Sequence, residues 1–218
     1  QLSLIAEKNK CNLEFEAAVC GGVPIIRSIK EGLVANNISK IYGIFNGTSN
    51  YILSSMDKNN ITFDDAISLA KKLGYSESNP SSDINGDDVS AKLKILSSLC
   101  FNTFINNNIY VEGIKDINQI DIINSNKLGY KIKLIGIAEK INSKLTQKVY
   151  PCLVKKSSYI GSIDGVLNAI IITGKPVGQS IIQGEGAGPN PTTSALVSDI
   201  SSILRGNIKY PFTISNNK

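Results

Sequence analysis

The sequence predicts an α+β fold, in which a mixed and largely antiparallel β-sheet is covered by helices. Helical periodicity dominates the first half of the chain, whereas segments with strand character, joined by turns, dominate the second half. Strands and helices do not alternate steadily, as they would in a parallel βαβ fold. With 218 residues, of which 42% are hydrophobic and 19% charged, the chain can form one sizeable globular domain or one domain with an appendage.

The first segments are expected to form the end of a helix, a strand and a second helix. Residues 1–10 have the pattern of a helix without a start signal. Residues 12–19 alternate and are β-prone, and the strand is expected to break at the glycines that begin with Gly21. Pro24 suits the first turn of a helix that continues to Leu33 with one apolar face.

A second strand is predicted over residues 38–45, which end at an Asn-Gly pair. The helices that follow are predicted over residues 48–56, 62–73 and 87–99. Thr62 is a suitable N-cap, and Gly74 ends that helix in the usual C-terminal position. A polar loop, residues 75–86, precedes the long amphipathic helix.

The last third of the chain combines one helical segment, residues 121–128, with a set of strands. The strands are predicted over residues 131–141, 146–154 and 166–174. A glycine-rich turn with the sequence GEGAG follows at residues 184–188 and leads into a helix over residues 192–204. A turn that leads into a helix N-terminus suits an anion.

The composition excludes several classes of function. The chain has no histidine, so imidazole ligation of zinc and a Ser-His-Asp triad are excluded, and proton transfer must use carboxylate, lysine, tyrosine, cysteine or water. The net charge of +5 comes almost entirely from lysine, since Arg27 and Arg205 are the only arginines. Without arginine clusters or interleaved aromatic residues, we expect no nucleic-acid partner.

The location is predicted from the cysteines and the apolar segments. The four cysteines form no C-x-x-C pair and lie in apolar surroundings, which indicates free thiols in a reducing compartment, the cytoplasm. No apolar run approaches the roughly 20 residues that span a bilayer, and no signal peptide is visible, so we expect no membrane association.

Residues 74–92 contain the densest set of chemically active side chains. Glu77, Asp83, Asp87 and Asp88 precede Lys92, and Asp88 and Lys92 are four residues apart on one face of the predicted helix. Carboxylates can bind an ammonium group, and a lysine can donate or accept a proton when its pKa is tuned. The alternative is a solvated acidic loop with a surface ion pair.

This stretch resembles the homoserine dehydrogenase signature, of the form G-Y-x-E-x-D-P-x-x-D-x-x-G-x-D-x-x-x-K. The residues in register are Gly74, Tyr75, Glu77, Pro80, Asp83, Gly86, Asp88 and Lys92. FEAAVCGGVPII at residues 15–26, GIFNGTSNYIL at 43–53, EGI at 112–114 and the final GxGAG also resemble that family, in the same order. Asn79 replaces the usual aspartate, at a position that we expect to shape the loop rather than carry the proton.

The resemblance implies an NAD(P)-dependent oxidoreductase that interconverts L-homoserine and L-aspartate 4-semialdehyde in threonine, methionine and isoleucine biosynthesis. Lys92 would be the general acid–base residue. The substrate site would consist of Glu77, Asp83, Asp88, Gly47, Thr48 and Tyr75. The cofactor would contact Gly74, Gly188 and Thr192. Taken alone, the GEGAG pattern is more often simply a tight turn before a helix.

The resemblance also implies a site for a monovalent cation, sodium, formed by Glu16 and the carbonyls of Val19, Gly21 and Val23. Glycine at position 21 would let the backbone curl inward, as a carbonyl cage requires. The alternative is a simple strand end followed by a turn.

The family resemblance predicts three parts: residues 1–11 as the remnant of a nucleotide-binding domain, 12–183 as the catalytic and dimerisation domain, and 184–218 as a segment returning to the nucleotide-binding domain. The resemblance also implies a homodimer. Because the chain begins with Gln1 and lacks a dinucleotide-binding fingerprint, we expect a fragment that is inactive alone. The alternative is a non-catalytic dimerisation or regulatory module that retains the fold. The presence of Glu77 and Lys92 favours the enzyme.

Overall fold

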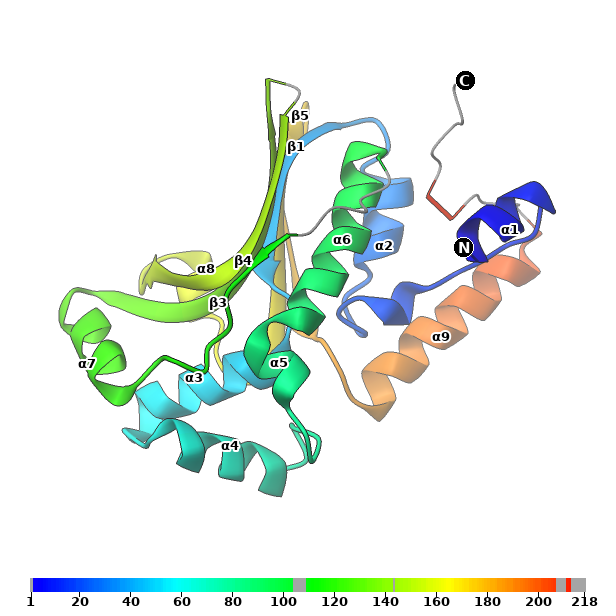
Figure 1. The fold of residues 1–218 in the computed structure, drawn as a ribbon. Helices are drawn as coiled ribbons and strands as arrows, with labels where there is room; N and C mark the ends of the chain where they lie inside the picture. The colour runs from blue at the N-terminus through cyan, green and yellow to red at the C-terminus, as the bar shows by residue number, and fades with distance from the viewer. Residues whose placement is uncertain (1, 104–108, 143, 207–210, 213–218) are drawn as a thin grey trace.

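A six-stranded sheet forms the centre of the computed structural model, which describes residues 2–103, 109–142, 144–206 and 211–212 (Figure 1). The strand order is β2-β4-β3-β1-β5-β6. Neighbouring strands are antiparallel except β2, which runs parallel to β4. The predicted class, α+β with a mixed and largely antiparallel sheet, is therefore confirmed.

The strands are β1 (Asn37–Ile44), β2 (Tyr110–Val111), β3 (Tyr130–Ile141), β4 (Lys144–Lys155), β5 (Leu167–Lys175) and β6 (Gly178–Glu185). The helices are α1 (Leu2–Lys8), α2 (Ile25–Arg27), α3 (Gly47–Asn59), α4 (Phe63–Lys72), α5 (Ser81–Asn85), α6 (Asp87–Phe101), α7 (Gln119–Lys127), α8 (Tyr159–Ser162) and α9 (Pro189–Leu204). A 3-10 turn, η1 (Glu16–Ala18), precedes α2, and a π turn, η2 (Ser28–Gly32), continues it.

The main hydrophobic core lies between one face of the sheet and the helices α2, α3, α4 and α6. Phe45, at the end of β1, is fully buried there, and its ring packs over Gly136 of β3, where a Cβ atom would lie 2.6 Å from the ring. A smaller cluster on the opposite face joins the sheet to α8, which Figure 1 shows on the other side from α6. Its residues are Ile44, Ile135, Ile160, Ile163, Ala169 and Ile171.

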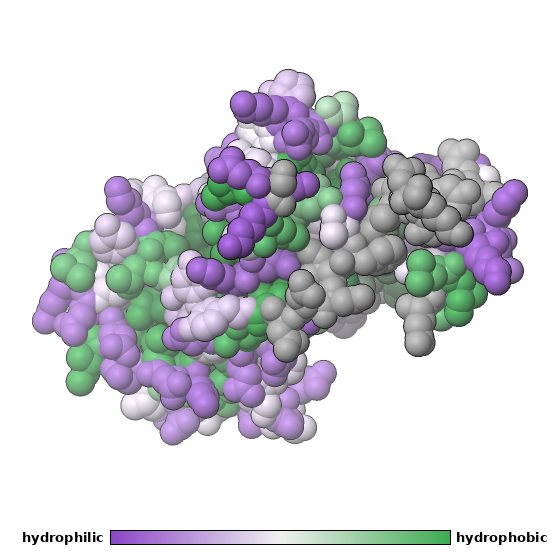
Figure 2. Space-filling model, turned by 45° about the horizontal axis from the view of Figure 1, so that its top comes forward, coloured by the Kyte–Doolittle hydropathy of each residue, from purple (hydrophilic) through white to green (hydrophobic). Residues whose placement is uncertain are grey.

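At the far end of the molecule, α9 extends away from the sheet and contacts η1 (Figure 1). One side of α9 is left exposed and apolar, at Leu196, Val197, Ile200, Ile203 and Leu204. On α1 the exposed apolar residues are Leu2, Leu4 and Ile5. Figure 2 shows apolar side chains at the surface of this arm.

The strand predicted over residues 12–19 is wrong. The structure has η1 there, because the backbone N–H of Glu16 donates to Asp199 of α9 at 2.9 Å and the Glu16 carboxylate accepts from the start of α2. The segment is therefore held by helices rather than by a neighbouring strand. The polar loop 75–86 also differs from expectation, since it contains α5.

Several short elements were not expected from the sequence: β2, α8 and β6. In contrast, the predicted N-cap of α4 is confirmed, since the Thr62 hydroxyl accepts a hydrogen bond from the backbone of Asp65. All of the cysteines are unpaired, as predicted. In the part of the chain that the structure describes, no helix is both long enough and apolar enough to cross a bilayer. Gln1 and the end of the predicted segment 184–218 lie outside the described residues.

Candidate active site

The candidate site lies where β1 ends and α3 begins, close to α5 and the start of α6 (Figure 1). Asn46 is the N-cap of α3, and its Oδ1 accepts a hydrogen bond from the backbone N–H of Ser49 at 2.8 Å. Gly47 follows, and a Cβ atom there would lie 2.7 Å from the carbonyl oxygen of Val166. The close approach of two backbones therefore requires glycine at this position.

The amide of Asn46 joins two carboxylates that come from different helices. Its Nδ2 donates to Asp83 Oδ1 of α5 at 2.7 Å and to Asp88 Oδ2 of α6 at 2.8 Å. An amide NH₂ group has two hydrogens, so both are used in these bonds. Asn46 is buried and its other polar atom caps α3, so it is fixed in place.

α5 is held in position by the segment that follows β2. The backbone N–H of Ile114 donates to the carbonyl of Ile84 at 2.8 Å, and a Cβ atom on Gly113 would lie 2.2 Å from that same oxygen. A side chain at position 113 would therefore displace α5 and Asp83 with it. This explains the glycine of the EGI sequence in physical terms.

Lys92, one helical turn after Asp88, completes a cluster of polar residues with Asn46, Asp83 and Asp88. Its Nζ lies 2.8 Å from Asp88 Oδ2 and donates to the carbonyl of Phe45 at 3.0 Å, with 17% of the side chain exposed. The predicted pairing of these two residues on one helix face is confirmed. Because an ammonium group has three hydrogens, one remains for a further acceptor.

The carbonyl of Phe45 also contacts the Cys20 thiol, whose Sγ lies 3.7 Å from it. Burial raises the pKa of this thiol to about 11, with smaller opposing effects of Lys92 and Asn168. The thiol is therefore neutral and can act as a weak donor.

The cluster has a local excess of negative charge. Burial raises the pKa of Asp83, and the charge of Asp88 raises it further, while Asn46, Thr48 and Lys92 act in the opposite direction. A carboxyl group whose pKa is raised in this way is stabilised by an additional cation. The arrangement therefore suits a ligand that carries an ammonium group and an oxygen within reach of Lys92.

The other residues expected at this site lie beside the cluster or apart from it. The hydroxyl of Thr48 donates to the backbone carbonyl of Tyr75 at 2.8 Å, and the Tyr75 ring packs on Tyr51 with 4.9 Å between ring centroids. Gly74 has a φ of 75° and turns the chain after α4. Glu77 is exposed, and among the described residues its side chain has no hydrogen bond or ion pair to Asp83, Asp88 or Lys92.

The expected cation residues lie in the turn between η1 and α2. Both oxygens of Glu16 accept backbone N–H groups, from Ile26 and Arg27, each at 2.8 Å. Burial raises the pKa of Glu16, against the effect of these two bonds. Val19 and Val23 are fully buried, and a cavity of about 110 Å³ is lined by Glu16, Gly21, Gly22, Pro24, Arg27, Ser194, Ala195 and Ser198. Among the described residues, no group of three His, Cys, Asp or Glu side chains could hold a metal ion.

The expected cofactor residues lie at the start of α9. Gly188 is the N-cap, with a φ of 117° that favours glycine, and its carbonyl accepts the backbone N–H of Thr192 at 3.1 Å. The hydroxyl oxygen of Thr192 would lie 3.6 Å from a Cβ atom on Gly21, so this turn adjoins the expected cation residues. The expected cofactor residues Gly188 and Thr192 thus lie at the start of α9, whereas Lys92 lies on α6.

Sequence reasoning missed two groups at the site, Asn46 and the carbonyl of Phe45. The Asn-Gly pair was interpreted only as the end of a strand, although asparagine before a helix is a strong N-cap signal. The role of the Phe45 carbonyl depends on the tertiary contact with α6, which no local pattern shows.

Comparison with known proteins identifies the family. The family model for homoserine dehydrogenase matches residues 24–201. The homoserine dehydrogenase of Neisseria gonorrhoeae is 44% identical over 202 residues, covering 92% of this chain and 46% of the relative. That of Helicobacter pylori is 47% identical over 192 residues, covering 88% and 46%.

Solved structures give the same result. A homoserine dehydrogenase from Thiobacillus denitrificans is 38% identical with a TM-score of 0.90, covering 97% of this chain and 51% of that one. A hyperthermophilic archaeal homoserine dehydrogenase mutant in complex with NADPH is 30% identical with a TM-score of 0.80, covering 95% and 60%. The chain spans about half the length of the curated relatives that it matches. By sequence and by fold, the chain belongs to the homoserine dehydrogenase family.

Proposed function

We propose that this chain supplies the substrate site and the proton-transferring lysine of an NAD(P)-dependent homoserine dehydrogenase, which interconverts L-homoserine and L-aspartate 4-semialdehyde. The observation that supports this most directly is the position of Lys92, held between Asp88 and the Phe45 carbonyl. It lies beside a carboxylate pair suited to an ammonium group. The pathway role is the synthesis of threonine, methionine and isoleucine.

In this proposal, Asp83 and Asp88 bind the α-ammonium group of the amino acid, through the carboxylate oxygens that Asn46 leaves free. A bound ammonium group offsets the repulsion between the two carboxylates, which is one cause of the raised pKa of Asp83. The bond from the Thr48 hydroxyl to the Tyr75 carbonyl fixes the start of the loop that carries Glu77. Glu77 contributes to binding through its charge, from the exposed loop.

Lys92 performs the proton transfer. As the aldehyde is reduced, its ammonium group donates a proton to the forming alkoxide oxygen, and in the reverse direction the neutral amine removes that proton. Asp88 Oδ2, 2.8 Å from the Lys92 Nζ, holds the ammonium group in place for this transfer. The Phe45 carbonyl restricts the ammonium group to one orientation, since the backbone there is fully buried.

A nicotinamide cofactor, when bound, supplies the hydride for the reduction and accepts it in the oxidation. Gly74, Gly188 and Thr192 would contact it. The start of α9 fits a partial contact, because Pro189 and Pro191 have no backbone N–H and leave few donors for a phosphate. The main phosphate-binding turn therefore belongs outside these 218 residues, in agreement with the 46% coverage of the relatives.

The sodium site formed by Glu16 and the carbonyls of Val19, Gly21 and Val23 remains part of the proposal. The donor set is a single carboxylate, already bound to two N–H groups, and backbone oxygens, of which that of Val23 accepts from Ile25 at 2.7 Å. Such a weak set suits a monovalent ion better than a divalent one. A melting temperature that is the same in sodium and in a bulky organic cation at equal ionic strength would contradict it.

We also propose a cytoplasmic homodimer that pairs through the sheet face carrying α8. On that face Tyr42, Cys152, Val154 and Leu167 are only partly buried against the smaller apolar cluster. The domain division into residues 1–11, 12–183 and 184–218 is retained, with the exposed apolar side of α9 covered by the nucleotide-binding domain. Light scattering that gives the mass of a monomer at micromolar concentration would refute the dimer.

The central experiment is steady-state kinetics on the full-length enzyme with Lys92→Ala. Loss of a general acid–base group lowers kcat by about 10²–10⁴-fold, while KM for homoserine changes little. Lys94→Ala, two positions further along the same helix, is the matched control and should retain wild-type kcat. An unchanged kcat in Lys92→Ala would remove Lys92 from the mechanism.

The isolated chain gives a second test. We expect it to bind homoserine through the carboxylate pair, without turnover, because the main cofactor contacts lie elsewhere. Reduction of aspartate semialdehyde at ordinary enzymatic rates by the 218 residues alone would overturn the proposed division of labour.

A further inference from the structure

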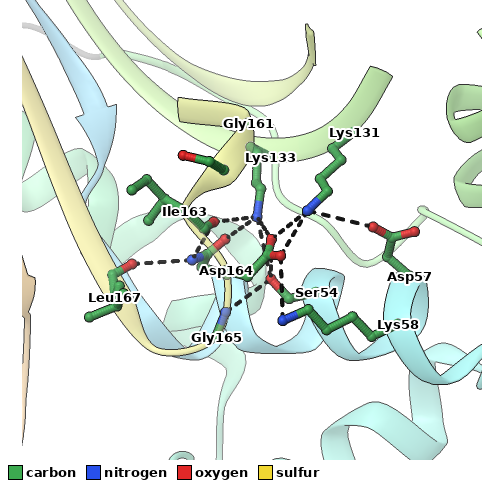
Figure 3. Close-up of polar contacts among 12 residues, drawn as sticks. Ser54, Asp57, Lys58, Lys131, Lys133, Gly161, Ile163, Asp164, Gly165 and Leu167 are labelled. Carbon is green, nitrogen blue, oxygen red and sulfur yellow. Dashed lines mark hydrogen bonds and ion pairs between the residues drawn. The ribbon is translucent and has the colours of Figure 1, made fainter. Parts of the chain in front are cut away.

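A buried lysine lies where β3, α3 and the loop between α8 and β5 meet (Figure 3). Lys133 is 1% exposed. Its ammonium group lies within hydrogen-bond distance of four acceptors: Asn50 Oδ1 at 2.9 Å, Ser54 Oγ at 3.3 Å, the Ile163 carbonyl at 2.6 Å and Asp164 Oδ1 at 2.9 Å. These acceptors come from α3 and from the loop, so the lysine joins the two.

Asp164 is the centre of a wider ionic group. Both of its oxygens accept from Lys131, at 2.9 and 2.7 Å, and Lys58 lies 3.5 Å away. Figure 3 shows these side chains converging on the Asp164 carboxylate from α3 and β3. Asp164 therefore keeps charged partners even when Lys133 is removed.

Stability alone does not explain the buried charge. Burial lowers the pKa of Lys133, and Asp164 opposes the effect. Replacing a buried ion pair by apolar residues of similar volume is often neutral or stabilising. A role in fixing geometry is therefore the better explanation, and the partners of Lys133 indicate which geometry it fixes.

The loop that Lys133 binds contacts one face of α3 at three successive positions. The Val166 carbonyl lies against Gly47, the Asn50 amide donates to the carbonyls of Ile163 at 3.3 Å and Leu167 at 3.1 Å, and the Ser54 hydroxyl accepts from Gly165 at 3.3 Å. Residues spaced by three and four lie on the same side of a helix. The loop thus holds the first two turns of α3. Lys133 binds α3 at Asn50 and Ser54, and it also binds the loop.

The same end of α3 carries the N-cap that joins the site carboxylates. Asn46 lies one turn before Asn50 and holds Asp83 and Asp88 through its amide. We infer that Lys133 is a positioning residue for the candidate active site: it fixes the start of α3 on the loop, and thereby fixes the Asn46 amide between the two carboxylates. This inference concerns the site named in the proposed function, but it can be tested without turnover.

The test is NMR on the 218-residue chain, using the side-chain amide of Asn46, assigned by its loss in Asn46→Asp. In Lys133→Met we expect its hydrogen exchange to accelerate at least tenfold, with a shifted titration of Asp83. Lys131→Met is the matched control. It also removes a lysine bound to Asp164, but Lys131 contacts α3 only at Asp57, about three turns from Asn46. In that control, the exchange rate should stay within twofold of wild type.

The hydrogen exchange of backbone amides in β3 and the urea unfolding of each variant distinguish a global loss of stability from a local effect at Asn46. If Lys133→Met destabilises the chain but leaves Asn46 exchange and the Asp83 titration at wild-type values, Lys133 is only structural and the inference is overturned. If Lys133→Met does not fold, Asn50→Ala replaces it, because this change cuts the same link and leaves the ionic group. Unchanged Asn46 exchange in Asn50→Ala would overturn the inference equally.

These outcomes are distinguishable from failure of the proposed function. A full-length enzyme that retains its kcat in Lys92→Ala would refute the catalytic proposal and leave the NMR coupling intact. If both hold, Lys133→Met in the full-length enzyme should lower kcat about tenfold and displace its pH profile, whereas Lys131→Met should change neither.

Discussion

Asn46 gives the sharpest test of the site, because one side chain caps α3 and holds both carboxylates. In Asn46→Ala, loss of the N-cap costs about 1 kcal/mol. Each hydrogen bond to a charged group is worth about 1.5–3 kcal/mol, and the lower value applies here because 29% of the Asp88 side chain is exposed. The expected loss of unfolding free energy is therefore about 4 kcal/mol, or about 8–16 °C in Tm for a chain of this size.

A companion variant, Asn46→Asp, separates the two roles. Aspartate is a good N-cap, so about 1 kcal/mol should be retained, but a third carboxylate then lies against Asp83 and Asp88. At neutral pH it should be less stable than Asn46→Ala, and it should recover as the pH falls and the cluster takes up a proton. The direction follows from linkage: acids whose pKa is raised on folding bind more protons in the native state, so stability rises as pH decreases.

The assay is urea unfolding, followed by circular dichroism, at neutral pH and near pH 4.5. If Asn46→Ala lowers the free energy of unfolding by no more than the roughly 1 kcal/mol of the N-cap, the amide does not stabilise the carboxylate pair. Wild-type stability of Asn46→Asp at neutral pH would also refute the reasoning, because three adjacent carboxylates cannot all remain ionised without cost.

Two further predictions concern packing and ionic contacts. Gly136→Ala would place a Cβ atom 2.6 Å from the Phe45 ring. We therefore expect urea unfolding to show a loss of about 1–3 kcal/mol in the free energy of unfolding. The control is Gly32→Ala, which should not destabilise the chain because no atom lies within 4 Å of the added Cβ. Burial alone would raise the pKa of Asp164, but Lys131 and Lys133 outweigh it and lower the pKa to about 2. The carboxylate should therefore contribute about 2 kcal/mol above its ordinary pKa of 3.8, lost as pH falls to about 2. Asp164→Asn should lack this loss in acid unfolding, and an equal acid sensitivity would contradict the assignment.

Local patterns were sufficient where a helix alone sets the geometry. The spacing of Asp88 and Lys92 predicted that they share one helix face, and in the structure they are neighbours that form an ion pair. The capped start of α4 followed from Thr62 in the same way. Helix geometry is local, so the sequence in one window determines it.

Where contacts join distant segments, the sequence was not sufficient. Residues 12–19 alternate like a strand, but Asp199 of α9 and the N–H groups of α2 satisfy Glu16, and the segment forms η1 instead. β6 was not expected, since its residues are polar or glycine at many positions and pairing with β5 decides its conformation. Asn46 was missed because its carboxylate partners lie on other helices.

The placement of β1 also affects how the chain can fold during synthesis. β1 is the first strand of this sheet to be made, yet it lies in the middle of the sheet: Gly43 pairs with Gly136 on one side and Ile170 on the other. At about 5–20 residues per second, an apolar strand waits on the order of ten seconds on the ribosome before both neighbours exist. During that interval, its unpaired edges can bind other chains, so the nascent protein should depend on a holding chaperone more than one whose central strand is made last.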